Sequence, residues 1–158
     1  MKKSNWKPYA AWIAATLAAG ALSAYLTRDG MELYRTAIRK PPLSPPGIVF
    51  PIVWTILYVL MGIGAARVQI VSEPEERTPH LTLYVVQLIF NFLWSIFFFN
   101  QRWFGFSLLW LIALWVLILA MILKFRKIER TAALLQIPYL IWVSFAAYLN
   151  AGVWLLNR

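Results

Sequence analysis

The sequence predicts an all-α integral membrane protein, with residues 1–158 forming a single domain of five transmembrane helices. Hydrophobic residues make up 61% of the chain and charged residues only 13%, and the mean hydropathy is +0.66. A soluble domain is nearer half apolar and a quarter charged. The chain also contains several apolar runs near the roughly 20 residues that a helix needs to cross a bilayer. Nine Trp and seven Tyr suit the two interfaces that such helices cross.

The first two spans lie on either side of a charged loop. Residues 8–26 form an uninterrupted apolar run, which is long enough to cross a hydrocarbon core of roughly 30 Å. Residues 27–40 carry charges of both signs, and the pattern Met31, Leu33, Tyr34, Ile38 indicates a short surface helix. The second predicted span covers residues 47–66.

A proline-rich segment leads into the second span and is expected to be stiff. Its two Pro-Pro pairs, at 41–42 and 45–46, fix φ and push the preceding residues toward extended conformations. We expect Ser44 to cap the second helix and Pro45 to occupy its first turn. Pro51 would then lie in the following turns and distort them. A rigid turn at the membrane surface and the rim of a ligand pocket are both consistent with this spacing.

The remaining apolar sequence divides into three spans. Thr78 and Pro79 predict the N-cap and first turn of the third helix. Residues 81–123 would span twice a bilayer as one helix, so a break at Asn100-Gln101-Arg102 gives spans 79–100 and 103–123. The fifth span covers residues 132–156. Pro138 within it predicts a bend just below Trp142.

The basic charge of the chain predicts its orientation. The formal net charge is +9, but the charged residues lie between apolar runs and not in one patch, so membrane orientation explains them better than nucleic-acid binding. With five spans, nine Lys and Arg fall on the N-terminal side, Lys2 and Lys3 among them, and six on the other side. This bias predicts a cytoplasmic N-terminus.

Several aromatic and amide side chains are predicted to meet in the half of the membrane beneath the proline-rich segment. Helical spacings of three or four residues place Trp54 with Tyr58, Asn91 with Trp94, and Trp142 with Ala146 and Asn150 on shared faces. Ala146 is small and leaves room beside Trp142. Two interpretations remain open: the tryptophans pack helices while the asparagines form interhelical hydrogen bonds, or these residues line a binding pocket.

The sequence excludes several kinds of catalytic chemistry. The absence of cysteine excludes disulfides, thiolate metal sites and thiol catalysis. The single histidine, His80, is expected in a loop away from the pocket, and we predict no metal site. No carboxylate falls within a predicted span, which removes paired-carboxylate chemistry.

Three blocks of sequence resemble the translocator protein / tryptophan-rich sensory protein (TspO/MBR) family, formerly the peripheral benzodiazepine receptor, in a bacterial-type form. The first is Lys40-Pro41-Pro42, Pro45-Pro46, Phe50 and Val53-Trp54, continued by Tyr58 and Met61-Gly62. The others are Asn91-x-x-Trp94-Ser95-x-x-Phe98-Phe99, and Pro138-Tyr139-x-x-Trp142 with Leu149-Asn150. Together they cover almost the whole chain.

The resemblance implies five tilted helices around one ligand pocket, a homodimer, and a location in a bacterial cell membrane. It implies binding of protoporphyrin IX, haem, lipid- or cholesterol-like molecules and benzodiazepine-type drugs, with no cofactor required. Carried onto this chain, Trp54 and Trp142 would flank the ligand and act in any catalysis. The ligand-binding residues would be Tyr34, Pro45, Trp54, Tyr58, Asn91, Trp94, Trp142, Ala146 and Asn150. The C-terminal cholesterol motif of mammalian members is incomplete, since no Lys or Arg follows Tyr148 before Arg158.

Two functions from different classes follow from this resemblance. One is a receptor for tetrapyrroles and drugs that also breaks down porphyrin with light and oxygen, with Arg35, Arg39 and Lys40 available to pair with the propionates. The alternative is a transporter of porphyrin, lipid or sterol-like ligands without turnover. An alternating-access carrier is disfavoured because the five spans show no internal repeat.

Overall fold

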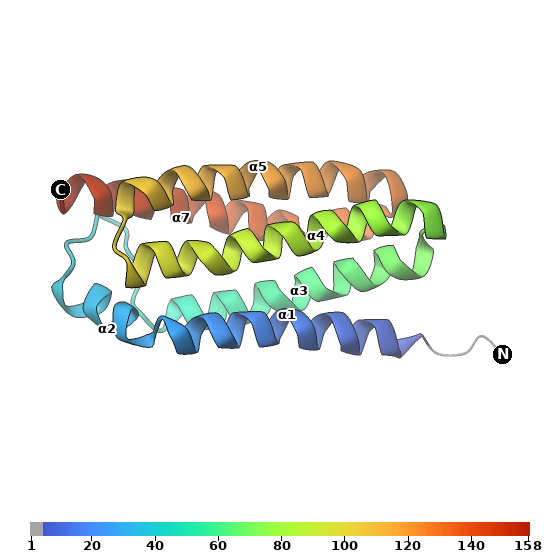
Figure 1. Cartoon of the computed structure of the whole chain (residues 1–158), viewed down its shortest axis with the longest axis horizontal. Helices are drawn as coiled ribbons and strands as arrows, with labels where there is room; N and C mark the ends of the chain where they lie inside the picture. The colour runs from blue at the N-terminus through green and yellow to red at the C-terminus, as the bar shows by residue number, and fades with distance from the viewer. Residues whose placement is uncertain (1–4) are drawn as a thin grey trace.

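The predicted spans form a bundle of long helices in the computed structural model, which describes residues 5–158 (Figure 1). The long helices are α1 (Trp6–Leu26), α3 (Val49–Val71), α4 (Pro74–Ser95) and α5 (Phe104–Ile128). The π-helix η1 (Ile96–Asn100) extends α4, and the last span consists of α6 (Arg130–Leu134) and α7 (Ile137–Leu156). Within the described residues, five helical segments are long and apolar enough to cross a membrane. The prediction of an all-α fold with five spans is therefore confirmed.

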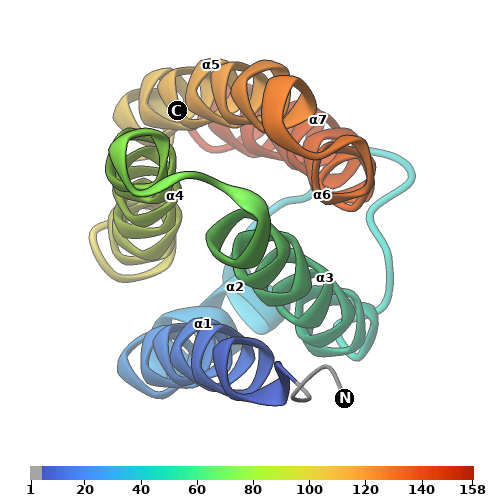
Figure 2. The same ribbon diagram turned by 90° about the vertical axis from the view of Figure 1, so that its right-hand side faces the viewer.

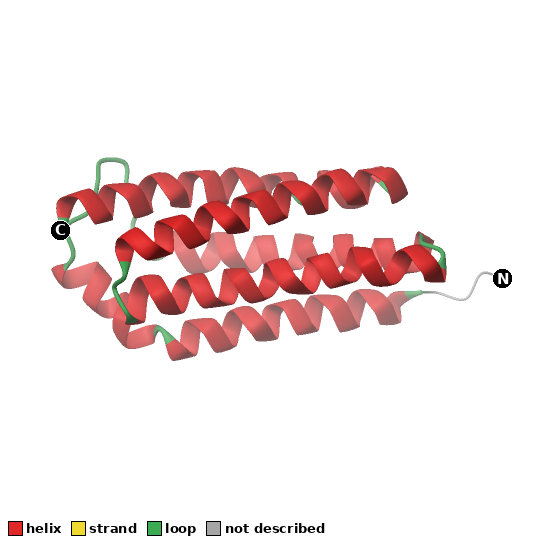
Figure 3. Ribbon diagram, turned by 45° about the horizontal axis from the view of Figure 1, so that its top comes forward, coloured by secondary structure: helices red, strands yellow, loops and turns green. Residues whose placement is uncertain are grey.

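The helices are arranged as a ring, which the view along the bundle shows (Figure 2). Helix α1 packs on α3, α5 packs on α7, and α4 packs on α5. The connections lie at the two ends of the bundle (Figure 3), and the chain enters at one end and leaves at the other (Figure 1). The short helix α2 (Arg28–Ala37) is the predicted surface helix, and we call its end of the bundle the α2 end.

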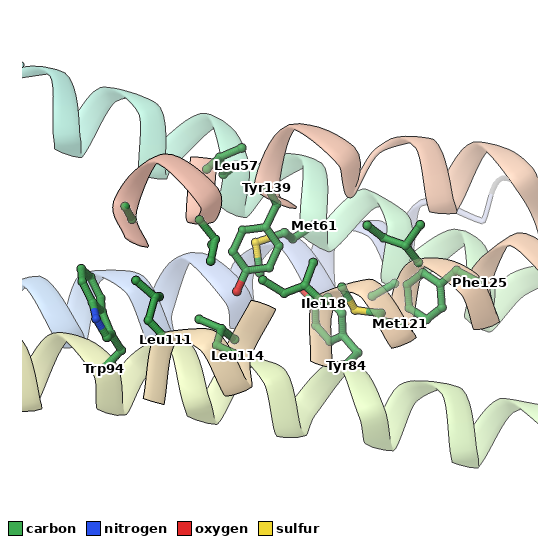
Figure 4. Packing of buried hydrophobic residues seen from close by; sticks show 14 of the residues in the cluster. Leu57, Met61, Tyr84, Trp94, Leu111, Leu114, Ile118, Met121, Phe125 and Tyr139 are labelled. Atoms are coloured by element: carbon green, nitrogen blue, oxygen red, sulfur yellow. The ribbon is translucent and has the colours of Figure 1, made fainter. Parts of the chain in front are cut away.

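The apolar core fills the bundle away from the α2 end. Its labelled side chains in Figure 4 run from Trp94 at one limit to Phe125 at the other. Helices α1 and α3 approach closely at Gly62, where a Cβ atom would lie 2.7 Å from the Cα of Ile13. A side chain at this position would separate the two helices, so the glycine permits their contact.

The predicted start of the second span is wrong. Helix α3 begins at Val49, and Ser44 lies in the preceding loop, where its Oγ donates a 2.7 Å hydrogen bond to the carbonyl of Pro41. Pro45 therefore also lies in the loop and not in a helical turn. Pro51 is the third residue of α3, where a backbone N–H has no acceptor within the helix, so it causes no distortion.

The predicted cap of the third span is also wrong. Helix α4 begins at Pro74, preceded by extended Glu73, and Thr78 and Pro79 lie inside the helix. Pro74 already occupies the first turn, where proline is well tolerated. The predicted break after this span is confirmed, since η1 ends at Asn100 and α5 begins at Phe104.

The fifth span is interrupted before Pro138 and is not a single bent helix. Helix α6 ends at Leu134, Leu135 and Gln136 form a turn, and α7 begins at Ile137. Pro138 lies in the first turn of α7. It has no N–H to donate to the carbonyl of Leu134, four residues earlier, and its ring would clash there. The predicted bend below Trp142 is therefore a break between two helices, and it lies at Leu135 and Gln136, before Pro138.

An ion pair joins α3 to the α5–α6 connection at the N-terminal end of the bundle. Arg67 donates from Nε and Nη2 to the two carboxylate oxygens of Glu129, at 2.9 and 3.1 Å. The same carboxylate caps α6 by accepting from the backbone N–H groups of Thr131 and Ala132. The hydrogen bond from Arg67, more than any other contact, lowers the pKa of Glu129 to about 2.

We predict that Glu129→Gln destabilises the folded protein at pH 7 by about 1–2 kcal/mol, because it removes the charge while leaving an amide that can still cap α6. Ionised Glu129 contributes its stability above its ordinary pKa of 4.5 and loses it as the pH falls toward 2. Thermal melts of detergent-solubilised protein should therefore converge for parent and variant as the pH is lowered below about 4. The control is Glu75→Gln, at an exposed position in the first turn of α4. A gap that stays constant with pH would contradict the prediction.

Candidate functional site

A cavity of about 780 Å³, including the space at its mouth, lies in the half of the bundle nearest α2. Its walls come from α1, α2, α3, α4, η1 and α7. The lining residues are Gly20, Ser23, Ala24, Thr27, Met31, Tyr34, Phe50, Pro51, Trp54, Tyr58, Trp94, Ser95, Phe98, Phe99, Trp142, Ala146, Leu149 and Asn150. Almost every long helix thus contributes to one apolar and aromatic space.

Seven of the nine residues predicted from the sequence line this cavity: Tyr34, Trp54, Tyr58, Trp94, Trp142, Ala146 and Asn150. Pro45 lies in the loop outside the lining, and Asn91 lies beneath it, one turn along α4 from Trp94. The predicted gathering of residues from three separate helices is therefore present in the structure.

One wall of the cavity was not predicted. Helix α1 contributes Gly20, Ser23 and Ala24, and Thr27 follows at its end. A feature of the sequence could have predicted this wall. Small and hydroxyl residues recur as a stripe at helical spacing in the otherwise apolar α1, at Thr16, Gly20, Ser23 and Thr27. Thr16, Ser23 and Thr27 are the buried side chains of this region, so the stripe marks the face of α1 turned into the bundle.

An aromatic wall is built around Trp54 on α3. The Trp54 ring stacks on Tyr58 at 5.4 Å between centroids and meets Trp142 edge-on at 6.5 Å. Phe50, one turn before Trp54 on α3, also meets the Trp142 ring edge-on, at 6.0 Å between centroids. The indole N–H of Trp142 is buried and has no hydrogen-bond partner among residues 5–158. This wall therefore offers flat π-surfaces to a bound molecule.

Trp94 on the opposite wall is held in place through Asn150. Its Nε1 donates to Oδ1 of Asn150 at 3.0 Å, and Nδ2 of Asn150 donates to the carbonyl of Phe104 at 2.8 Å. Ser107 also donates to Oδ1, at 3.3 Å. A fully buried amide is thus satisfied by partners on α4 and at the start of α5, which is the interhelical role expected of a buried asparagine.

The π-helix η1 shapes the side of the cavity next to Trp94. Phe98 stacks on the Trp94 ring at 5.2 Å, and Phe99 meets Phe98 edge-on at 4.9 Å. Both phenylalanines line the cavity. The wider turn of a π-helix changes the direction in which side chains leave it, and such turns are frequent at functional sites. Here it brings two consecutive aromatic residues to the same space.

A hydrogen-bonded chain forms beneath the cavity. Tyr58 OH donates weakly to Oδ1 of Asn91 at 3.4 Å, Nδ2 of Asn91 donates to Tyr139 OH at 2.8 Å, and Tyr139 OH donates to Oε1 of Gln87 at 2.8 Å. Asn91, Gln87 and Tyr139 are all buried. For Asn91 the packing interpretation therefore describes the structure, whereas Trp54 and Trp142 face open space.

The cavity lining contains no charged side chain, and α2 and the loop that follows carry cations beside it. Lys40 Nζ lies 5.0 Å from the ring centroid of Tyr34 and donates to the carbonyls of Arg35 and Ile38. Arg35 pairs with Glu32 at 2.6 Å, which lowers the pKa of the Glu32 carboxyl. Burial raises the pKa of Tyr34. Charge is thus confined to the rim.

The potential metal ligands in the described part of the chain do not form a cluster. Residues 5–158 contain no group of three or more His, Asp and Glu side chains that could hold a metal ion. His80 lies in α4 and not in a loop, and its Nδ1 is 2.7 Å from the carbonyl oxygen of Glu76.

The sequence matches known proteins along almost its whole length. The model of the TspO/MBR family matches residues 12–155. A tryptophan-rich protein TspO of Chlorobaculum tepidum is 37% identical over 142 residues, covering 89% of this chain and 90% of that protein. A tryptophan-rich sensory protein of Cereibacter sphaeroides is 34% identical, with 97% and 93% covered. The translocator protein of Bos taurus is 31% identical, with 97% and 92% covered.

Proposed function

The chain belongs to the TspO/MBR family of integral membrane proteins, and on that premise we propose that its cavity binds protoporphyrin IX-type tetrapyrroles and benzodiazepine-type drugs. The observation that carries the proposal is the aromatic wall of Trp54, Tyr58 and Trp142 around a cavity whose lining has no charged side chain. Sites for small molecules are typically concave and mostly apolar. A flat aromatic macrocycle can stack on such a wall or meet its ring edges.

The distribution of charge supports one orientation of a porphyrin. An ionised propionate inside the uncharged cavity would lose its hydration without gaining a partner, which is costly. We therefore place the macrocycle beside Trp54 and Trp142 and the propionates at the rim near Lys40. Arg35 and Arg39 lie on the same end of the bundle and can add charge-assisted contacts. Haem is included in the proposal as a ligand held by its macrocycle, since no His or Cys lines the cavity.

We predict that Ala146→Thr weakens binding of protoporphyrin IX about 5–30-fold, which corresponds to the 1–2 kcal/mol cost of overfilling a packed site. Ala146 is buried and lines the cavity, so the larger side chain takes space from the ligand. Quenching of tryptophan fluorescence during titration measures the affinity. The control is Ala113→Thr, an equivalent change on an exposed face of α5. Equal affinities for the parent and Ala146→Thr would contradict the proposed position of the ligand.

A second candidate function is light- and oxygen-dependent breakdown of the bound porphyrin. The favouring observation is that two indoles, Trp54 and Trp142, lie 6.5 Å apart on the cavity wall. A porphyrin in light transfers its excitation to oxygen, and these indoles are placed to meet the reactive oxygen that forms. Transport of porphyrin, lipid or sterol-like ligands without turnover remains the alternative.

We predict that Trp54→Phe and Trp142→Phe each keep the fold and slow the loss of porphyrin absorbance under aerobic illumination at least about tenfold. A tenfold change corresponds to about 1.4 kcal/mol in the barrier. Trp6→Phe, at an exposed position at the start of α1, serves as the control. Light without oxygen should give no conversion. If the parent protein converts porphyrin no faster than free tryptophan does, binding or transport without turnover is the function.

We further propose a bacterial cell membrane as the location, with the N-terminus in the cytoplasm. The support is the excess of Lys and Arg predicted on the N-terminal side; Lys2 and Lys3, which contribute to it, lie outside the described residues. Because the chain has no cysteine, Lys7→Cys and Arg158→Cys can be labelled separately with an impermeant reagent in intact cells. We expect the reagent to label Arg158→Cys and not Lys7→Cys. Labelling of Lys7→Cys alone would show that the N-terminus lies outside the cell, opposite to the predicted orientation.

A further inference from the structure

A second, smaller pocket lies beside the main cavity at the α2 end of the bundle. It forms where α2 meets η1 and the start of α5, three segments that lie at the same end in Figure 1. Its apolar walls include Leu33 and Ile38 from α2 and Phe104 from α5. Among the described residues that line it, Arg102 alone carries a charge. The pocket therefore combines apolar walls with one cation.

Close contacts fix the frame of this pocket. A Cβ atom at Gly30 would lie 2.5 Å from the carbonyl oxygen of Phe99, so the backbone of α2 rests directly on η1. Nδ2 of Asn100 donates to the carbonyl of Leu26 at 2.9 Å, which joins the end of η1 to the end of α1. The pocket is thus bounded by segments that are packed and hydrogen-bonded to the rest of the bundle.

The positive charge of Arg102 has no acidic partner in the described part of the chain. Within residues 5–158 the ion pairs are formed by Arg28, Arg35 and Arg67, and Arg102 belongs to none of them. The two acidic side chains of α2 lie 3.9 and 2.6 Å from arginines of α2 itself. A free guanidinium beside apolar walls suits a ligand that has both an anionic group and a hydrocarbon part.

The backbone at Arg102 is a second, separate indication that this side chain is used. Its φ is 55°, in the left-handed region that glycine adopts without steric cost and other residues do not. The position lies in the connection 101–103, between η1 and α5. Strained residues of this kind cluster at binding and functional sites. Here the strained position carries a long cationic side chain at the pocket.

Exposed aromatic residues indicate the depth of the pocket in the membrane. Trp103, the residue after Arg102, is exposed and stacks on Phe97 at 6.0 Å between centroids. At the end of α1, Tyr25 is also exposed, and the guanidinium of Arg28 lies 4.4 Å from its ring centroid. Tryptophan and tyrosine at the ends of spans are typical of the headgroup level. Arg102 is therefore expected at the depth of lipid phosphates.

We propose that this pocket binds an anionic glycerophospholipid of the surrounding membrane. Its phosphate lies at Arg102, and the upper part of one acyl chain lies against Leu33, Ile38 and Phe104. Charge complementarity selects the class of lipid, because an unpaired arginine attracts an anionic headgroup, whereas a zwitterionic headgroup brings its own cation. The site is separate from the main cavity and does not depend on what that cavity binds.

The test compares two lipids that differ only in their headgroup. Native mass spectrometry of the detergent-purified protein measures the affinity for the first dioleoyl-phosphatidylglycerol bound and for the first dioleoyl-phosphatidylcholine. We expect the parent protein to prefer phosphatidylglycerol about fivefold or more. Arg102→Gly should remove most of this preference without lowering the lipid-free thermal midpoint, because glycine suits the backbone there. Arg102→Lys should keep part of the preference, since it keeps the charge and loses the bidentate geometry.

Two further variants separate the charge from its place and from the apolar walls. Arg158→Gly removes an exposed arginine at the same end of the bundle and should leave the preference unchanged. Leu33→Trp keeps every charge and fills the pocket, so it should weaken binding of phosphatidylglycerol about fivefold or more.

Three results would overturn the proposal. An unchanged preference in Arg102→Gly would show that Arg102 does not hold the headgroup. An equal loss in Arg158→Gly would show a general effect of net charge. Displacement of phosphatidylglycerol by an equal concentration of oleate would show that the pocket takes a fatty acid and not a phospholipid. Since no porphyrin is present, failure here is distinct from failure of the tetrapyrrole proposal.

Discussion

A polar group in the hydrocarbon layer of a membrane must find its hydrogen bonds inside the protein, and the arrangement of this bundle depends on that constraint. Asn150 meets it by joining α7 to Trp94 on α4 and to the first turns of α5. Asn91 meets it through Tyr58 and Tyr139, which joins α4 to α3 and α7. Without such contacts, helices with apolar surfaces on all sides would have little to fix their rotation, because lipid is as good a neighbour as another apolar side chain. The two amides therefore determine which faces of α4 and α7 point inward.

The same contacts separate a packed part of the bundle from a hollow one. Below Asn91 the interior is filled by large side chains such as Tyr84, Ile118 and Phe125. Above it, Ala146 and the small residues of α1 replace large ones, and the aromatic rings are held at the walls. Trp94 cannot fall into the space because its indole N–H is fixed on Asn150. The cavity is thus maintained by polar contacts between its walls.

Much of this fold could be predicted from hydropathy, because the length of an apolar run reports directly on whether it crosses a bilayer. The errors lie at prolines. A proline tolerates several positions near a helix start, so Pro45, Pro79 and Pro138 could not by themselves locate the ends of α3, α4 and α7. Site residues could be predicted where a spacing of three or four residues placed them on one face of a helix, as for Trp142 and Ala146. The α1 wall was missed because Gly20 and Ser23 are inconspicuous singly. The contact of Asn157 with the loop was missed because its side chain bonds to the backbone of Arg39, which no sequence pattern identifies.

Helix α7 carries both a wall of the cavity and the attachment of the external loop. Trp142, Ala146 and Asn150 face the hollow. Tyr148 and Gly152 contact the loop 38–48 from another side of the same helix, and Asn157 holds the loop just past the helix end. Over this length an α-helix moves as a stiff rod, so a displacement that begins on one side is transmitted to the other. The contents of the cavity are therefore mechanically connected to the loop outside the long helices.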